Sequence, residues 1–505
     1  MKRTKILSLF LALLMLASAL LTACGGGKDP VVTDGPGTAG TDTAPAPETE
    51  PPVPETEPVD PDTVHDLPEG LSFDGAAFTM ASNEKWSCLV NYEDTNGEAL
   101  NDTQYEVKRY AEELLGVSVT EELTLSPTAG NTAIDYVLSG ETEIQVFNLL
   151  DREAFSAATE NVFLQLSEAR YMDLSKKYWG SGIAEKLAFG DYQFLALDSF
   201  QLNSFRNAGC LFMNLAVAEN YNVTVPYDLV KSGKWTFDAL AQYAGTVLND
   251  VDGDGRMTKD DAVTFGSTDH RQTLLNYLTA AGVPFMGKDA DNLPCFTCFG
   301  NEKLVDVIAW VKATFFDPAS SVAEKANGDS LNTTKMFIHD RQLFVTGRLG
   351  NMLGDELRNM ESTYAVFPIP KYDESQENYV SRAVDGIFPM IIGTVQDPDM
   401  VSAVLEAMSA YAYRELLPVL VETSLQLKYN NDPRSVENIQ IVFDTRTLEL
   451  SDMIVWDEFG DTPTWYMMYT DTAPATWLAS VQGKVEGILD GCIEDISYLM
   501  KEISK

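Results

Sequence analysis

The stretch Ala76-Ala77-Phe78-Thr79-Met80-Ala81 alternates as a half-buried β-strand does. Asp102 to Leu115 then has the apolar spacing of an amphipathic helix, and Gly116, Val117 and Val119 begin a second strand. A strand, a helix and a strand in succession are typical of an α/β protein. We therefore predict an α/β fold.

Outward from this unit, the same pattern continues along the chain. Two short apolar runs, Ile144 to Leu150 and Tyr192 to Leu197, predict further strands. The C-terminal part, from Met400 to Leu427 and from Thr476 to Ile503, is predicted to be mostly helical. The globular part begins near Leu71 and is longer than one hydrophobic core normally organises, so we expect two lobes.

The N-terminus has the pattern of an export signal. Three basic residues precede an apolar run from Ile6 to Leu21, and the segment Leu21-Thr22-Ala23-Cys24 resembles the bacterial lipobox. We expect residues 1–23 to be a lipoprotein signal peptide and Cys24 to carry the lipid, a palmitate-type anchor. The alternatives are an ordinary secretory signal and a retained membrane helix, which would need about 20 apolar residues.

The segment 24–68 has the composition of a tether. It is rich in Pro, Thr, Glu, Asp and Gly, so it is predicted to be disordered and extended. The whole chain has a formal net charge of -41, which argues against nucleic acid as a partner. Attachment to a membrane is therefore expected through the lipid rather than through charge.

A calcium-type loop spans residues 250–261. Carboxylates stand at the first, third, fifth and twelfth positions, and Gly255 permits the sharp turn. Asp replaces the usual Glu at the last position, as in extracellular calcium modules. The alternative is an acidic surface turn. We expect a structural calcium ion, with candidate ligands Asp250, Asp252, Asp254, Arg256 through its carbonyl, Thr258 and Asp261.

Several stretches, in this order, resemble a known family. They are Met172–Ser175 with Tyr178-Trp179, Leu211–Asn214, Pro226–Val230, Gly233–Asp238 and Tyr364–Tyr372. Their order resembles the extracellular solute-binding lipoproteins of ABC importers, of the carbohydrate-type family 1-like group.

The resemblance implies a two-lobed periplasmic-binding-protein-like (Venus flytrap) fold, with a cleft between the lobes and a helical C-terminal part. It implies a monomer that captures a small solute, an oligosaccharide by expectation, and passes it to ABC permease subunits without catalysis. The chain is then divided as lobe 1 in 69–198, lobe 2 in 199–328, a return to lobe 1 in 329–384 and the remainder of lobe 2 in 385–505.

Candidate ligand-binding residues follow predicted strands or lie in aromatic segments. Loops that leave the carboxyl ends of strands open on the cleft in α/β lobes. Sugar rings need aromatic faces and planar polar groups. For any single Trp, packing in the core is the alternative, and it is our interpretation of Trp179 and Trp235. The candidates are Asn83, Trp86, Asp151, Arg152, Asp385, Trp456 and Trp465.

Apart from Cys24, the cysteines favour no metal or redox site. Cys295 and Cys298 form a single close pair, and no second pair or neighbouring His completes a zinc site. We expect buried thiols or one local disulfide. The remaining cysteines are Cys88, Cys210 and Cys492.

Two other functions remain open. A cell-surface glycoside hydrolase would use the same anchor, tether and calcium loop, and paired carboxylates suffice for its chemistry. The other alternative is a surface adhesin or structural lipoprotein, whose lobes would not close around a solute. In each case the expected location is the outer face of the cell membrane, in a Gram-positive bacterium.

Overall fold

The computed structural model describes residues 60–86, 95–190, 192–193, 195–258, 260–261, 264–266, 270–322, 333–426 and 434–503. They belong to one compact unit that begins at Val59. The predicted signal peptide, Cys24, Cys88 and most of the tether lie outside the described residues.

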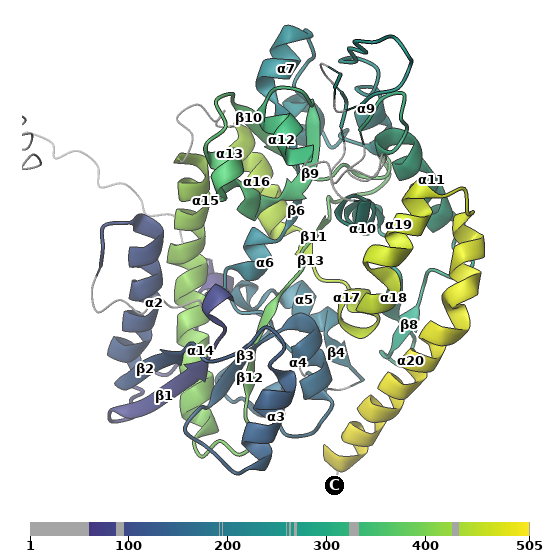
Figure 1. Ribbon diagram of the computed structural model, residues 1–505. Coiled ribbons are helices and arrows are strands. Elements are labelled where there is room, and N and C mark those ends of the chain that lie inside the picture. Colours follow the sequence, from purple (N-terminus) through teal and green to yellow (C-terminus); the bar gives the residue numbers. More distant parts are fainter. Residues whose placement is uncertain are drawn as a thin grey trace, which may run out of the picture. The chain divides into compact units, whose positions relative to one another are not determined.

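Lobe 1 is built on a four-stranded sheet in the order β12-β3-β1-β2 (Figure 1). β1, β2 and β3 run parallel, and β12 is antiparallel to β3. All of β3 is buried, whereas β2 alternates between buried and exposed residues, as central and edge strands do. The predicted strand, helix and strand are confirmed. The strands are β1 (Ala76–Ala81), β2 (Val117–Glu122), β3 (Val146–Leu150) and β12 (Ile387–Ile391).

α2 and α3 connect the parallel strands of this sheet, and further helices complete lobe 1. α2 buries Val107, Ala111 and Leu115 and packs against α14. It ends at Gly116, whose φ of 60° is in the left-handed region and whose amide caps the carbonyl of Glu112. The helices are α2 (Ala99–Leu115), α3 (Gly130–Leu138), α4 (Asp151–Ala158), α5 (Ser181–Lys186) and α14 (Pro398–Tyr411), which continues through the π-helical η6 (Ala412–Leu416) into α15 (Leu417–Gln426).

Lobe 2 is built on an antiparallel sheet in the order β10-β6-β9. The strands are β6 (Gly209–Asn214), β9 (Phe344–Arg348) and β10 (Tyr364–Phe367). Around them lie α6 (Asn203–Arg206), α7 (Leu215–Asn220), α8 (Tyr227–Lys231), α9 (Phe237–Ala241), α10 (His270–Ala280), α11 (Glu302–Phe315), α12 (Thr333–Ile338), η5 (Leu349–Met352), α13 (Asp355–Arg358) and α16 (Arg434–Asp444).

The predicted division between the lobes is wrong for the segment 329–384 and for the start of the segment 385–505, whereas α16 packs on β10 in lobe 2, as predicted. The segment 329–384 was expected in lobe 1, but its strands β9 and β10 pair with β6 of lobe 2. The segment 385–505 was expected in lobe 2, but β12 pairs with β3 and α14 packs on α2, both in lobe 1. The apolar pattern identifies such short buried strands without specifying the partner of each.

Two short parallel strands, β11 (Ser381–Arg382) and β13 (Arg446–Thr447), lie between the two sheets (Figure 1). We call them the hinge strands. Buried Arg382 donates two hydrogen bonds of 2.7 Å to the carboxylate of Asp452, just beyond β13. The hinge strands are therefore tied to the C-terminal part by a buried ion pair.

The C-terminal part is helical, as predicted, and reaches both lobes. α17 packs on α4 of lobe 1, and α19 packs on α10 of lobe 2. The predicted strand at 192–197 is only partly formed, since Leu195–Leu197 are buried but lie outside any strand. The helices are α17 (Leu450–Ile454), α18 (Trp456–Phe459), α19 (Asp461–Tyr469) and α20 (Pro474–Ile503), and the hairpin strands are β4 (Ala188–Phe189), β5 (Tyr192–Gln193), β7 (Met286–Lys288) and β8 (Pro294–Phe296).

The end of the predicted tether is folded onto lobe 1. Residues 61–63 form a short 3-10 helix, and His65 hydrogen-bonds to the hydroxyl of Tyr110 at 2.8 Å. Lys176 pairs with Asp66 at 2.8 Å, and Lys177 pairs with Asp60 at 2.6 Å. The boundary at residue 68 is therefore too late, because the last acids of the segment find basic partners on the lobe.

Candidate ligand site

One edge of the lobe 1 sheet gathers polar residues that are far apart in the sequence. β3 ends at Leu150, and Asp151 begins α4 directly after it. The amide of Asp151 donates to the carbonyl of Gly386 at 2.9 Å, where β12 begins. Asp385 therefore lies at the same edge as Asp151.

Asp151 is buried, with 4% of its surface exposed. Its Oδ1 accepts a hydrogen bond of 2.9 Å from the amide of Arg152. Burial raises the pKa of Asp151 to about 7, and the negative charges of Asp452 and Asp385 act in the same direction. This carboxyl group therefore titrates near neutral pH.

Asp385 links the edges of the two sheets. Its Oδ2 accepts a hydrogen bond of 3.0 Å from Nη1 of Arg348, the last residue of β9 in lobe 2. Its carbonyl accepts a bond of 3.1 Å from the Asn203 amide. Asp385 has a φ of 53°, a left-handed conformation uncommon for a residue other than Gly. Such backbone strain concentrates at functional sites.

Arg348 lies among other cationic groups. Burial lowers its pKa, and the charges of Arg382 and Arg271 act in the same direction, against that of Asp385. Its Nη1 also donates to Asn207 Oδ1 at 3.1 Å.

Trp456 lies between the two lobes. The guanidinium of Arg152, from α4, lies 5.0 Å from the centre of its ring, and that of Arg271, from α10, lies 4.5 Å from it. Both are within cation–π distance. The half-buried Trp456 thus holds one arginine from each lobe.

A cavity of about 790 Å³ opens between the lobes. Residues 97–101 at the start of α2 line it from lobe 1, and Arg206, Gly350 and Arg358 line it from lobe 2. A side chain at Gly350 would meet the carbonyl of Arg206 at 2.9 Å, so only Gly allows this approach. Arg206 precedes Asn207, the partner of Arg348, which connects the cavity to the charged cluster.

The structure brings together four of the seven predicted ligand-binding residues, namely Asp151, Arg152, Asp385 and Trp456. Asn83 lies at the same sheet edge, but its side chain is used in a turn, donating to the carbonyl of Leu125 at 2.5 Å and accepting from the Lys85 amide at 2.9 Å. Trp86 ends the short helix 84–86, and its side chain lies outside the described residues.

Trp465 packs in a separate aromatic group. Its ring centre lies 5.8 Å from that of Tyr469, which in turn lies 5.6 Å from His270 at the start of α10. It therefore supports α10, the helix that carries Arg271, without a described contact to the cluster. Trp179 and Trp235 are fully buried, which confirms the packing interpretation of both.

Sequence reasoning missed Arg206, Arg271 and Arg348. Asp151 was predicted because it follows a strand. Of the three arginines, only Arg348 has a comparable position, at the end of a strand. Arg206 and Arg271 lie in helices, where an arginine gives no sign of facing a cleft.

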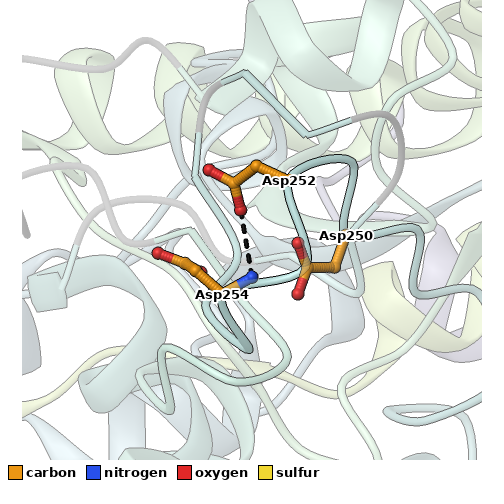
Figure 2. A group of neighbouring side chains, drawn as sticks. All are labelled: Asp250, Asp252 and Asp254. Carbon is orange, nitrogen blue, oxygen red and sulfur yellow. Dashed lines mark hydrogen bonds between the residues drawn. The ribbon is translucent and has the colours of Figure 1, made fainter.

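The predicted calcium loop lies in lobe 2. One carboxylate oxygen from each of Asp250, Asp252 and Asp254 lies within 4.8 Å of the others, and Figure 2 shows the three side chains around one turn. The two oxygens of Asp250 accept bonds from the amides of Gly253 at 2.6 Å and Gly255 at 2.7 Å. Carboxylates converging in this way suit an oxygen-binding cation such as Ca²⁺.

Asp261 fastens the two ends of this loop. It accepts bonds from the amides of Val251 at 2.9 Å and Thr258 at 2.6 Å, and from the Thr258 hydroxyl at 2.9 Å. Burial tends to raise the pKa of Asp261, but these bonds outweigh it and lower the pKa. Asp261 therefore joins the two ends of the loop by hydrogen bonds and lies outside the group of three carboxylates. The Thr258 hydroxyl donates to Asp261. Arg256 offers its amide to Asp254 at 2.8 Å.

The loop lies far from the cleft along β9. Arg341 donates to the carbonyl of Asp261, and Thr264 forms a bridge with Gln342, both just before β9 begins at Phe344. Arg348 lies at the other end of this strand, about 13 Å away at the usual rise per residue.

Among the described residues, Cys210, Cys295, Cys298 and Cys492 are free thiols, so the predicted alternative of a disulfide between Cys295 and Cys298 is not formed. Across the same part of the chain, every helix is too short or too polar to cross a membrane.

No family model and no curated protein matches the chain, but solved structures do. A cyclo/maltodextrin-binding protein solved with maltotetraose is 13% identical, with a TM-score of 0.55 over 84% of this chain and 98% of its own. UgpB from Mycobacterium tuberculosis, solved with glycerophosphocholine, is 12% identical, with a TM-score of 0.53 over 83% and 99%. An ABC substrate-binding protein from Listeria monocytogenes, solved with cycloalternan, is 11% identical, with a TM-score of 0.52 over 84% and 100%. The chain has the two-lobed fold of these binding proteins.

Proposed function

We propose that the protein is a lipid-anchored binding protein on the outer face of the cell membrane, which captures a carbohydrate between its lobes and delivers it to an ABC importer. One observation carries the proposal. Charged and aromatic side chains from both lobes meet at a single place, through the pair Arg348–Asp385 and through Trp456 with Arg152 and Arg271. The likeness to binding proteins solved with maltotetraose and cycloalternan supports a carbohydrate as the solute.

Binding and closure are coupled in such an arrangement. Each lobe presents only part of the site, so a solute that contacts both lobes gains most in the closed form. The hinge strands are where the chain would bend, and Asp385, next to them, already has an uncommon backbone conformation. The importer would then recognise the closed conformation of the binding protein.

The anchor and tether complete this proposal. A lipid on Cys24 would keep the protein beside its transporter, and the acidic segment after it would set the distance that the lobes can reach. Because residues 60–66 are bound to lobe 1, the free length of the tether ends near Asp60.

We also propose that Ca²⁺ braces the loop 250–261 through Asp250, Asp252 and Asp254, with the Arg256 carbonyl as a further oxygen ligand. The three carboxylates fit the ion because Ca²⁺ takes oxygen ligands in flexible geometry. The loop's position at the far end of β9 favours a structural role over a contact with the solute.

A glycoside hydrolase is the second candidate, because Asp151 titrates near neutral pH beside Asp385. Such enzymes use one carboxyl group as an acid and another as a nucleophile or base. Here Asp385 is ion-paired with Arg348, and Asp151 is buried and hydrogen-bonded to its own helix. Neither carboxylate is free to meet a glycosidic bond, which favours binding without cleavage.

A calorimetric screen of oligosaccharides, with the sugar recovered afterwards by mass spectrometry, tests the proposal. We expect saturable micromolar binding and recovery of intact sugar. Trp456→Ala should weaken binding by about 10-fold or more, because it releases two arginines held by cation–π contacts of about 1 kcal/mol each.

The matched control is Tyr498→Ala, which removes an aromatic ring that is 62% exposed on α20. It should bind sugar as the wild type does. Release of shortened sugars would favour the hydrolase, and absence of binding to any saccharide would leave the adhesin.

A further inference from the structure

The region between the lobes is rich in arginine although the protein as a whole is acidic. The chain has 76 acidic and 35 basic residues. Nevertheless, the interlobe cavity and the adjoining cluster contain Arg152, Arg206, Arg271, Arg348 and Arg358.

Most of these charges lack an acidic partner. Within the described part of the chain, no ion pair joins Arg152, Arg206 or Arg271 to a carboxylate. The Nε of Arg206 is buried and has no hydrogen-bond partner among the described residues. Burial lowers the pKa of Arg206, with no opposing carboxylate. A half-buried cation without a partner is costly, so its presence needs an explanation.

The acids of the same region do not balance them. Asp385 is paired with Arg348, and Asp151 carries only part of its negative charge at neutral pH, because burial raises its pKa to about 7. Glu98, at the cavity wall, accepts a bond of 3.1 Å from Asn101, and Asp457 is exposed beside Trp456. The cleft therefore has an excess of positive charge within an anionic protein.

Trp456 orders two of the arginines. With their guanidinium groups over its ring, Arg152 and Arg271 are held without a carboxylate that would neutralise them. A guanidinium kept in this way still presents its N–H donors, whose planar arrangement matches a carboxylate or phosphate group.

We propose that the solute is an acidic saccharide, an oligosaccharide bearing carboxylate groups, and that Arg206 and Arg271, which have no carboxylate partner among the described residues, bind its anionic groups. This inference rests on the proposed function and narrows its substrate class. The arginines come from lobe 2, and Arg152 lies across the cleft from them, so an anionic solute would also draw the lobes together.

Calorimetry with three probes tests the inference: trigalacturonate, neutral galactotriose and glycerol phosphate. We expect trigalacturonate to bind at least ~10-fold more tightly than galactotriose, and more weakly as the salt concentration rises. Arg271→Gln and Arg206→Gln should each weaken trigalacturonate binding by about 10- to 100-fold, as expected for a lost charged hydrogen bond. Thermal melts establish that each variant is folded, and Arg271→Lys should recover part of the affinity.

The matched control is Arg170→Gln, which removes an exposed arginine paired with Asp399 at 3.0 Å on lobe 1. It should leave binding unchanged. Equal or tighter binding of galactotriose would overturn the inference and leave the proposed function standing. If only glycerol phosphate binds, the inference that the solute is a saccharide would be wrong. If neither the three probes nor any other saccharide binds, the proposed function would be wrong as well.

Discussion

Asp151 shows how a single residue joins fold and site. It follows β3 directly and begins α4, and it lies close enough to Asp452, the partner of Arg382 in the hinge strands, for the charge of Asp452 to raise its pKa. Because its carboxyl group is buried, the folded protein favours the neutral form, whereas the unfolded chain ionises near the usual pKa of about 3.9.

This difference predicts a pH-dependent stability. Between about pH 4 and pH 7 the folded state binds more protons than the unfolded state, so the contribution of Asp151 to stability falls as the pH rises. Asp151→Asn should therefore melt close to the wild type at pH 4.5 and at a higher temperature than the wild type at pH 8. Differential scanning calorimetry across this range measures the difference.

Asp490→Asn is the control, since Asp490 is exposed on α20. A difference for Asp151→Asn that stays constant with pH would show that the Asp151 carboxyl group ionises freely in the folded protein. Asp198, also buried with its pKa raised by burial to about 7, remains in both proteins and does not affect the comparison.

The buried pair Arg382–Asp452 predicts a second effect at this scale. Arg382→Ala leaves the Asp452 carboxylate buried and unpaired, which should cost about 3–5 kcal/mol in the free energy of unfolding. Urea denaturation measures it. Arg170→Ala, at an exposed pair, should cost less than about 1 kcal/mol, and an equal loss in both variants would mean that Arg382 has no special role.

At the scale of elements, the sequence specified individual strands and helices better than their partners. β1, α2 and β2 form as the periodicity predicts, because neighbouring elements pack on one another. β9, β10 and β12 are all short and mainly buried, yet two belong to lobe 2 and one to lobe 1. The pairing of these strands is set by tertiary contacts between residues far apart in the sequence. The order of the motifs that resemble solute-binding proteins therefore indicated the fold but not the boundaries between the lobes.

The candidate site divides in the same way. Asp151, Arg152 and Asp385 were predictable because they flank buried strands whose ends face the cleft. Arg206 and Arg271 were not, because a solvated arginine and a cleft arginine have the same local sequence pattern. Trp465 was predicted to bind the ligand because it lies in an aromatic segment. An aromatic segment that packs in the core has the same sequence pattern, and Trp465 packs against Tyr469.

The loop 250–261 gives a prediction for one element. If Ca²⁺ binds as in extracellular modules, ion at ten times its Kd adds about 1.4 kcal/mol to the free energy of unfolding. Wild type should thus melt a few degrees higher with millimolar Ca²⁺ than with chelator. Asp250→Asn combined with Asp254→Asn should remove this difference, as measured by thermal melts.

The control combines Asp399→Asn with Asp490→Asn, which removes the same number of acids elsewhere. It should retain the response to Ca²⁺. A wild-type melt that is insensitive to chelator would contradict the calcium brace.

For the whole molecule, the proposed anchor predicts where the protein is found. In a Gram-positive host, wild type should sediment with membranes and Cys24→Ala should appear in the medium, because the thiol that receives lipid is missing. Immunoblots of the two fractions measure this. Cys492→Ala, at a thiol in α20, should stay with the membrane, and retention of Cys24→Ala there would contradict lipid anchorage at this residue.

In the proposed function, a solute is held between the two lobes. Small-angle X-ray scattering of the protein with and without the tightest-binding saccharide tests it most directly. We expect a smaller radius of gyration at saturation, because contacts with both lobes favour the closed form. Saturation of the site with an unchanged scattering curve would contradict it.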